Sequence, residues 1–198
     1  MFEYSRLWFV PKRQDFIDFL DITKSSYLVF QISKSLSQGK LEIITEQLIR
    51  INELYNLGIV LLPIGIAQQH EDDLPLRALK TNLGNVPSYL QEDFHVNSIL
   101  HIIANAKLYI GTSLHGCITA YSFNVPVVNL QKAVLKVKWY TDVWYTEREN
   151  EIANVDNFTN NIPIVLTKEY KKLIEKSQKH IEVLIEQKGE RYLKLLVS

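Results

Sequence analysis

The sequence predicts an α/β fold built on a doubly wound, mostly parallel sheet. Residues 27–62 have the pattern of strand, helix and strand, a βαβ unit that implies a right-handed parallel crossover. Residues 108–130 continue the alternation as strand, turn, helix and strand. We find no internal repeat and no second core pattern in the 198 residues, so a single α/β domain over residues 25–198 is expected.

The βαβ unit is recognised by two short apolar runs on either side of an amphipathic segment. Residues 27–32 (YLVFQI) have the composition of a buried strand, and residues 59–62 form the second such run. We expect Asn56 and Gly58 to end the intervening helix. That helix covers residues 41–55, with apolar side chains at helical spacing: Ile44, Leu48, Ile51 and Leu54.

The segments between the βαβ unit and residue 108 carry weaker signals. Residues 74–83 predict a short helix, and residues 86–94 are compatible with either a short strand or a loop. A further helix is predicted over residues 99–106, with Asn97 or Ser98 as its capping residue.

Both ends of the chain, and a long segment near the C-terminal end, carry aromatic or amphipathic patterns. Residues 1–24 predict an N-terminal arm that docks on its own domain, or else an inter-domain linker. Residues 131–161 predict a long loop in which Trp139 and Tyr140 either stack on sugar rings or pack in an interface. Residues 168–196 predict a long amphipathic helix that Gly189 is able to interrupt.

Charge and composition argue against several classes of protein. Twenty-two basic and 22 acidic residues cancel, which argues against a nucleic-acid partner. Cys117 is the only cysteine, so an internal disulfide and a multi-cysteine zinc site are excluded. The longest apolar run, residues 57–67, contains Pro63 and is shorter than the ~20 residues that a membrane span needs. The N-terminus lacks the pattern of a signal peptide. We therefore expect a cytoplasmic protein without a membrane span.

The motifs of several common enzyme classes are absent from the sequence. It contains no GxGxxG, GxxxxGK[ST], GxSxG or HExxH pattern. The run HEDD at residues 70–73 permits a metal-ligand interpretation. Four adjacent side chains cannot all converge on one ion, however, and a solvated helix start is the commoner interpretation. No metal or other cofactor is predicted.

The turn that follows residues 108–110 carries a concentrated set of polar groups. Thr112 and Ser113 offer hydroxyls, and exposed amides at a helix start form an anion site with the positive end of the helix dipole. His115 is able to act as a general acid or base near neutral pH. Gly116 leaves room for a close approach between backbone and ligand. The alternative interpretation is structural, with the hydroxyls as helix caps and His115 hydrogen-bonded.

Residues 93–130 (DFHVNSILHIIANAKLYIGTSLHGCITAYSFNVPVVNL) resemble the signature region of the polysaccharide pyruvyl transferase family. Members carry an acidic residue and a helix ahead of a strand, then a Ser/Thr-Arg-Leu-His-Gly run, a helix of small and apolar residues, and a G-x-P-V-V strand. Upstream, YLVFQIS and IVLLPIGIAQQHEDD resemble the first two strands of the family's C-terminal half. The resemblance implies a Rossmann-like domain like the C-terminal one of a GT-B enzyme, with residues 1–24 similar to the inter-domain linker.

The resemblance also implies an activity and a set of residues for it. Family enzymes transfer the enolpyruvyl unit of phosphoenolpyruvate to a sugar of a cell-surface polysaccharide as a ketal. His115 matches the candidate general acid, and the amides of Leu114 and Gly116 would hold the donor phosphate. Lys136 matches a family lysine that contacts phosphate or carboxylate.

Two departures from the family pattern leave alternatives open. Ser113 stands where the family has arginine, and serine cannot supply a bidentate, charged grip. The donor is therefore phosphoenolpyruvate or another small anion. The chain also resembles only one half of a two-domain enzyme, so a separate N-terminal domain or a homo-oligomer would complete the saccharide acceptor site. The alternatives are a catalytically silent half-domain that binds a sugar phosphate or a partner protein, and a nucleotide-sugar glycosyltransferase or epimerase half-domain.

Overall fold

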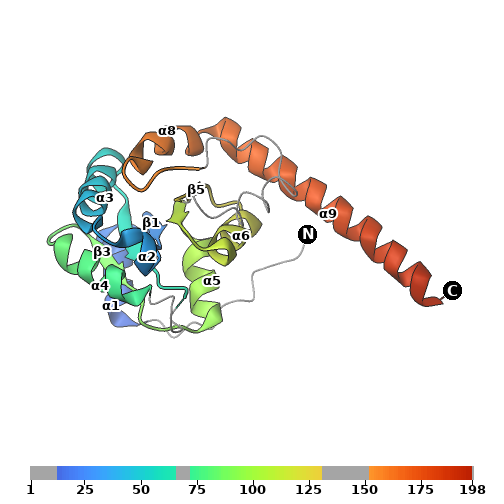
Figure 1. The fold of residues 1–198 in the computed structure, drawn as a ribbon, viewed down its shortest axis with the longest axis horizontal. Coiled ribbons are helices and arrows are strands. Elements are labelled where there is room, and N and C mark those ends of the chain that lie inside the picture. The colour runs from blue at the N-terminus through green and yellow to red at the C-terminus, as the bar shows by residue number, and fades with distance from the viewer. Residues whose placement is uncertain (1–12, 66–71, 131–151, 198) are drawn as a thin grey trace.

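The computed structural model describes residues 13–65, 72–130 and 152–197 (Figure 1). The strands are β1 (Tyr27–Phe30), β2 (Gly58–Leu61), β3 (Ser88–Leu90), β4 (Leu108–Gly111) and β5 (Val127–Asn129). The helices are α1 (Gln14–Ile22), α2 (Lys34–Ser37), α3 (Leu41–Tyr55), α4 (Asp73–Asn82), α5 (Val96–Ala104), α6 (Leu114–Ser122), the 3₁₀ helix η3 (Phe158–Asn161), α8 (Ile162–Val165) and α9 (Lys168–Val197).

The five strands form one parallel sheet in the order β3-β2-β1-β4-β5, which confirms the predicted fold class. The central strand β1 pairs with β2 on one side, with Val29 opposite Val60, and with β4 on the other, with Val29 opposite Tyr109. The direction in which successive strands are added reverses between β1 and β4. The crevice beyond the carboxyl ends of these two strands is therefore the topological switch point, where open α/β sheets bind ligands.

Helices cover both faces of the sheet, and alternate residues of β1 point into two separate cores. Leu28 and Phe30 lie in the core formed with α3, α4, α8 and the first turns of α9. Tyr27 and Val29 lie in the core formed with α1, α5 and α6. All four side chains are buried, as expected for a parallel strand covered on both faces.

The predicted helix over residues 41–55 is α3, with the same bounds. Ile44, Leu48 and Ile51 are fully buried, whereas Leu54 is 62% exposed and does not belong to the apolar face. Asn56 ends the helix in the left-handed conformation, with φ at 52°. The prediction that Gly58 helps to end it is wrong, because Gly58 opens β2. A Cβ there would lie 2.3 Å from Cγ2 of Thr23, so glycine is needed for close packing.

The ambiguous segment before α5 contains the edge strand β3, which pairs with β2. Helix α5 begins at Val96, three residues earlier than predicted, and neither Asn97 nor Ser98 is its cap. The Asp93 carboxylate instead accepts hydrogen bonds from the Ser98 hydroxyl at 2.5 Å and from the His95 backbone N–H at 3.0 Å. These two bonds lower the pKa of Asp93 below its usual value.

Helix α1 docks on its own domain through aromatic side chains. Phe16 and Phe19 are buried, and the ring of Phe16 lies with its centroid 4.8 Å from that of Tyr89. The rings of Phe16 and Phe19 also contact the ring of Tyr27. The packing supports the docking interpretation of this segment, and the role of residues 1–24 as an inter-domain linker stays a prediction.

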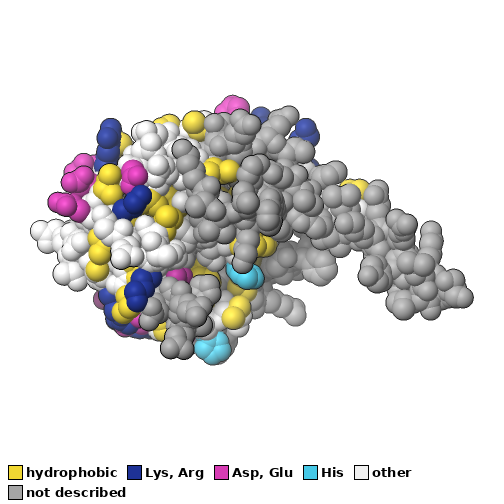
Figure 2. All heavy atoms as spheres, in the orientation of Figure 1, with side chains coloured by type: hydrophobic (Ala, Val, Ile, Leu, Met, Phe, Trp, Pro, Cys, Tyr) yellow, Lys and Arg dark blue, Asp and Glu magenta, His cyan; other side chains and the backbone are white. Residues whose placement is uncertain are grey.

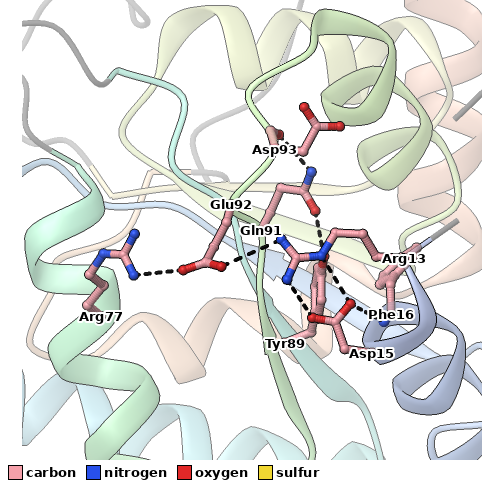
Figure 3. A network of polar contacts seen from close by, with 8 residues as sticks. All are labelled: Arg13, Asp15, Phe16, Arg77, Tyr89, Gln91, Glu92 and Asp93. Atoms are coloured by element: carbon pink, nitrogen blue, oxygen red, sulfur yellow. Dashed lines mark hydrogen bonds and ion pairs between the residues drawn. The ribbon is translucent and has the colours of Figure 1, made fainter. Parts of the chain in front are cut away.

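An exposed network of charges ties α1 to β3 and α4 (Figure 3). Arg77 of α4 donates to Glu92 at 2.8 Å, and Arg13 lies 3.5 Å from the other oxygen of Glu92. Arg13 also donates to Asp15 at 2.8 Å. The hydrogen bond and charge of Arg77 are the main causes that lower the pKa of Glu92. Exposed pairs of this kind contribute little to stability.

Replacing Arg77 with methionine should raise the pKa of Glu92 toward that of an ordinary glutamate. The pKa of Glu92 is lower in the folded state than its ordinary value. Its pairing therefore stabilises the folded protein at pH values above the ordinary glutamate pKa, and this stabilisation is lost as the pH falls through the folded-state pKa. An NMR titration of the Glu92 carboxyl carbon measures the shift. The matched control is Arg50→Met on α3, which should leave the Glu92 titration unchanged, and an unchanged curve in Arg77→Met would contradict the assignment.

The C-terminal helix α9 has 30 residues and continues through Gly189. The prediction that Gly189 interrupts it is wrong, because one glycine costs a helix only ~1 kcal/mol relative to alanine. Tyr170 and Ile174 near its start are buried in the core. In Figure 1 its distal part extends away from the sheet.

The face of the molecule shown in Figure 2 has mixed charge in its described part. On the face shown in Figure 2, basic and acidic side chains lie interspersed over the part of the chain that is coloured. In the described ranges, no helix has the length and apolar character needed to cross a bilayer.

Candidate functional site

The polar turn singled out in the sequence lies at the topological switch point of the sheet. Strand β4 ends at Gly111 and α6 begins at Leu114, so Thr112 and Ser113 form the whole connection. Ser113 is the N-cap residue in an extended conformation, with φ at −80° and ψ at 122°. Its hydroxyl accepts a hydrogen bond from the Gly116 N–H at 3.3 Å, which is long for such a cap.

A buried glutamine at the end of β1 holds this turn from below. The side-chain oxygen of Gln31 accepts from the backbone N–H groups of Thr112 at 2.8 Å and Ser113 at 2.9 Å. The Thr112 hydroxyl lies 3.1 Å from the same oxygen and accepts from the Ser33 N–H at 3.2 Å. Thr112 is therefore engaged in the interior, and a direct contact between its hydroxyl and a ligand requires it to leave these partners.

The other end of the glutamine side chain contacts a buried carboxylate. The Gln31 Nε2 group donates to Oδ2 of Asp72 at 2.7 Å, and the Gly65 N–H donates to the same oxygen at 2.9 Å. Asp72 is 3% exposed, so the prediction of a solvated helix start is wrong for this residue. The network joins the ends of β2, β1 and β4, which are neighbours in the sheet.

Metal binding gains no support from the structure. Within the described ranges, no three histidine, cysteine, aspartate or glutamate side chains are arranged to hold an ion. His70 and Glu71 lie outside those ranges.

Two amides at the start of α6 are left unpaired within the part of the chain that the structure describes. The first N–H groups of a helix have no partner within the helix. Gln31 and Ser113 take up the amides of Thr112, Ser113 and Gly116, whereas those of Leu114 and His115 have no hydrogen-bond partner among the described residues. The positive end of the helix dipole adds to their attraction for an anion.

The side chains around these amides differ in exposure. His115 is exposed, and Leu114 and Ser113 are half-buried, so the histidine is able to meet a ligand at the turn. Gly116 is buried against Tyr109 of β4, and a Cβ at position 116 would lie 2.0 Å from the tyrosine hydroxyl oxygen. The close approach that requires glycine here is therefore one with the strand beneath.

The Tyr109 hydroxyl is an unusual buried group. It is fully buried and has no hydrogen-bond partner in the part of the chain that the structure describes. Burial raises the pKa of Tyr109 well above its ordinary value, so the hydroxyl stays protonated.

Three predicted site residues cannot be placed. Lys136, Trp139 and Tyr140 lie outside the described residues. Sequence reasoning in turn missed Gln31 altogether and gave Asp72 no part in the turn. The one local signal for Gln31 is a polar residue near the end of the apolar run YLVFQI.

A sequence model of the polysaccharide pyruvyl transferase family matches residues 8–131, which is more than half of the chain. The chain belongs to this family. The match includes the turn and α6, so the candidate site lies within the matched region. No curated protein matches the chain significantly in sequence.

Several solved structures share the fold of this chain. UDP-GlcNAc 2-epimerase from Methanocaldococcus jannaschii matches with a TM-score of 0.57 and 15% identity, over 88% of this chain and 50% of that one. S. aureus MnaA in its UDP co-structure matches with a TM-score of 0.60 and 15% identity, over 98% and 52%. The trehalose-6-phosphate synthase OtsA matches with a TM-score of 0.56 and 13% identity, over 98% and 48%.

These likenesses establish the fold as Rossmann-like and of the kind found in GT-B enzymes. At such low identity they carry no further conclusion about the chemistry. The chain spans about half the length of these proteins.

Proposed function

We propose that this chain is the donor-binding half of a pyruvyl transferase that transfers pyruvate from phosphoenolpyruvate to a sugar of a cell-surface polysaccharide as a ketal. The observation that carries the proposal is the pair of amides of Leu114 and His115, which have no partner among the described residues and lie next to the exposed His115 side chain at the switch point. Membership of the family supports the reaction class. A separate N-terminal domain or a second copy of this chain would supply the acceptor half, in the cytoplasm.

The anionic groups of the donor determine where it binds. Phosphoenolpyruvate carries a phosphate and a carboxylate, and the amides of Leu114 and His115 offer two N–H donors at the positive end of α6. In our proposal they hold the phosphate, with the Ser113 hydroxyl and the Gly116 amide adjacent and Lys136 as a further contact. Trp139 and Tyr140 would stack on the sugar.

His115 is proposed to act as the general acid. Proton transfer from its imidazolium to the methylene carbon of phosphoenolpyruvate turns that carbon into a methyl group and leaves positive charge at C2. One sugar hydroxyl adds to C2 and loses its proton to a base. The oxygen of a second sugar hydroxyl then forms a bond to C2, and the bond between C2 and the phosphate oxygen breaks. The proton of that second hydroxyl leaves with the phosphate. The products are the pyruvate ketal and inorganic phosphate, so atoms and charge balance.

Replacing His115 with alanine should abolish most turnover without affecting the fold. General acid catalysis contributes ~10²–10⁴-fold to rate, and the release of phosphate from phosphoenolpyruvate in the presence of saccharide acceptor should fall by about that factor. Since His115 is exposed, the melting temperature should stay near the wild-type value.

The matched control is His95→Ala, because His95 is also exposed and lies at the start of another helix. It should retain wild-type phosphate release. A large fall in melting temperature for His115→Ala would assign His115 a structural role instead, and unchanged turnover would remove it from the mechanism.

A nucleotide-sugar half-domain is the second candidate. What supports a nucleotide-sugar function is that the similar structures include a UDP-GlcNAc 2-epimerase in complex with UDP-GlcNAc and UDP, and S. aureus MnaA with UDP. Ser113 in place of the family arginine favours instead the catalytically silent half-domain, because the turn offers any anionic donor fewer charges than the family motif does. Calorimetric titration with phosphoenolpyruvate and with UDP-GlcNAc separates the two functions. Binding of neither ligand leaves the catalytically silent half-domain.

A further inference from the structure

The strongest unexplained feature near the turn is the side chain of Gln31, which spans two loops from the central strand. Its oxygen accepts hydrogen bonds from two backbone N–H groups of the β4–α6 turn, and its nitrogen donates to Asp72, the residue before α4. Both Gln31 and Asp72 are almost fully buried, at 2% and 3% exposure. Hydrogen bonds at both ends of its amide hold this buried glutamine side chain in one conformation.

The orientation of the Gln31 amide follows from the groups around it. A glutamine side chain can be placed in two ways that exchange its oxygen and nitrogen. The backbone N–H groups of Thr112 and Ser113 only donate, so they require the oxygen. The Asp72 oxygen at the other end belongs to a carboxylate, which only accepts hydrogen bonds, as it does from the Gly65 N–H. It therefore requires the nitrogen of Gln31. The two requirements agree, and only one orientation satisfies both.

We propose that Gln31 is a positioning residue for the anion site. By holding the amides of Thr112 and Ser113 toward the sheet, it orients the turn so that the next two amides, of Leu114 and His115, are left without a partner among the described residues and can meet the anion. Asp72 acts one step behind, by fixing the orientation of Gln31. The inference rests on the proposed function, because it concerns the same anion at the same turn.

Loss of this side chain should weaken anion binding more than it weakens the fold. Without Gln31, one buried and one partly buried amide lose their acceptor, and the turn must rearrange to find another. A rearranged turn redirects the amides of Leu114 and His115. We expect Gln31→Leu to raise the dissociation constant for phosphoenolpyruvate about tenfold or more, by calorimetry well below the melting temperature.

The chain supplies a matched control in Gln47 of α3. This side chain is also buried, donates to the Val155 carbonyl at 2.7 Å and accepts from the Thr159 N–H at 3.2 Å. It lies in the core on the α3 side, on a different element from the turn. Gln47→Leu should lower the melting temperature and leave the affinity for phosphoenolpyruvate unchanged. If it weakens binding as much as Gln31→Leu does, the effect is general softening and the proposal is overturned.

A reversed pair tests the orientation directly. Gln31→Glu alone places two buried carboxylates in contact and should weaken binding. Adding Asp72→Asn restores one acceptor for the turn amides and one donor between the two side chains, with the same total charge as the wild type. The double variant should recover affinity relative to Gln31→Glu. Failure to recover would overturn the role assigned to Asp72.

Hydrogen exchange at the amides of Thr112 and Ser113 separates the positioning role from the proposed function. These amides should exchange slowly in the wild type and fast in Gln31→Leu, whichever ligand binds. Fast exchange with unchanged phosphoenolpyruvate affinity overturns the positioning proposal and leaves the function standing. If the wild type binds inorganic phosphate but not phosphoenolpyruvate, the proposed function fails and phosphate becomes the probe. If the wild type binds neither, both proposals fail.

Discussion

Replacing Gly116 with alanine should destabilise the protein by ~1–3 kcal/mol, although alanine is the better helix former by ~1 kcal/mol. The added Cβ would lie 2.0 Å from the hydroxyl oxygen of Tyr109 and 2.5 Å from its Cζ. It would also lie 2.9 Å from Cδ1 of Ile64. Tyr109 is fully buried, so its ring cannot move aside without disturbing the core beneath α6. Chemical denaturation measures the loss.

The same substitution should weaken anion binding, because relief of the clash pushes the first turn of α6 outward. Ser122→Ala is the control on the same helix, since Ser122 is exposed near its last turn. It should leave both stability and affinity near the wild-type values. Equal stability of wild type and Gly116→Ala would show that α6 does not rest on Tyr109 as described.

A double-mutant cycle identifies the tyrosine as the cause. Tyr109→Phe removes only the hydroxyl and leaves Cζ at 2.5 Å, so Gly116→Ala should remain destabilising in that background. Tyr109→Leu removes the ring, and there Gly116→Ala should cost less than it does in the wild type. A coupling energy near zero between positions 109 and 116 would refute the explanation.

The glycine of the turn illustrates what the sequence could and could not predict. A histidine-glycine pair at a helix start suggests a ligand that approaches the backbone. The contact that the structure reveals is with Tyr109, seven residues earlier in the chain. Local sequence gives no sign that a strand residue reaches under the next helix, because that depends on how α6 packs across the sheet.

Strong local signals gave correct elements. Helix α3 has the predicted bounds because an apolar stripe and a left-handed Asn56 define both its face and its end. The edge strand β3 stayed ambiguous because three residues are too few to show a period. The start of α5 was misplaced because its N-cap residue is His95, whose side chain makes no capping hydrogen bond, so the usual capping signal is absent there.

The site divides in the same way. The turn at residues 112–116 was found because hydroxyls, a histidine and a glycine occur together in sequence. Gln31 was missed because its partners, Thr112 and Ser113, lie 81 and 82 residues away. A single polar residue in a strand carries no information about which loop it holds.

The exchange of the family arginine for Ser113 changes what this turn can do. Ser113 caps α6 through a long hydrogen bond, so its side chain contributes little to the stability of the helix. Replacing it with arginine would therefore remove little stabilisation. It is half-buried at the end of the connection and two residues before the exposed His115. A guanidinium at this position would add charge and a planar pair of donors beside the amides of Leu114 and His115.

Replacing Ser113 with arginine should strengthen phosphoenolpyruvate binding. A hydrogen bond to a charged group contributes ~1.5–3 kcal/mol, which corresponds to about a 10- to 150-fold lower dissociation constant. Loss of the Ser113 cap should lower the stability of the helix by about 0.5 kcal/mol. This is the low end of the usual range, because the capping hydrogen bond is long. Calorimetric titration with phosphoenolpyruvate measures the gain, and binding should weaken with added salt.

Two further substitutions at the same position separate the causes of that gain. Ser113→Gln removes the cap and adds length without charge, so it should bind phosphoenolpyruvate no better than the wild type. Ser113→Lys adds a point charge without the planar fork and should fall between the two. If Ser113→Arg binds phosphoenolpyruvate no better than Ser113→Gln, this turn does not hold that donor, and a gain for UDP-GlcNAc instead would favour the nucleotide-sugar half-domain.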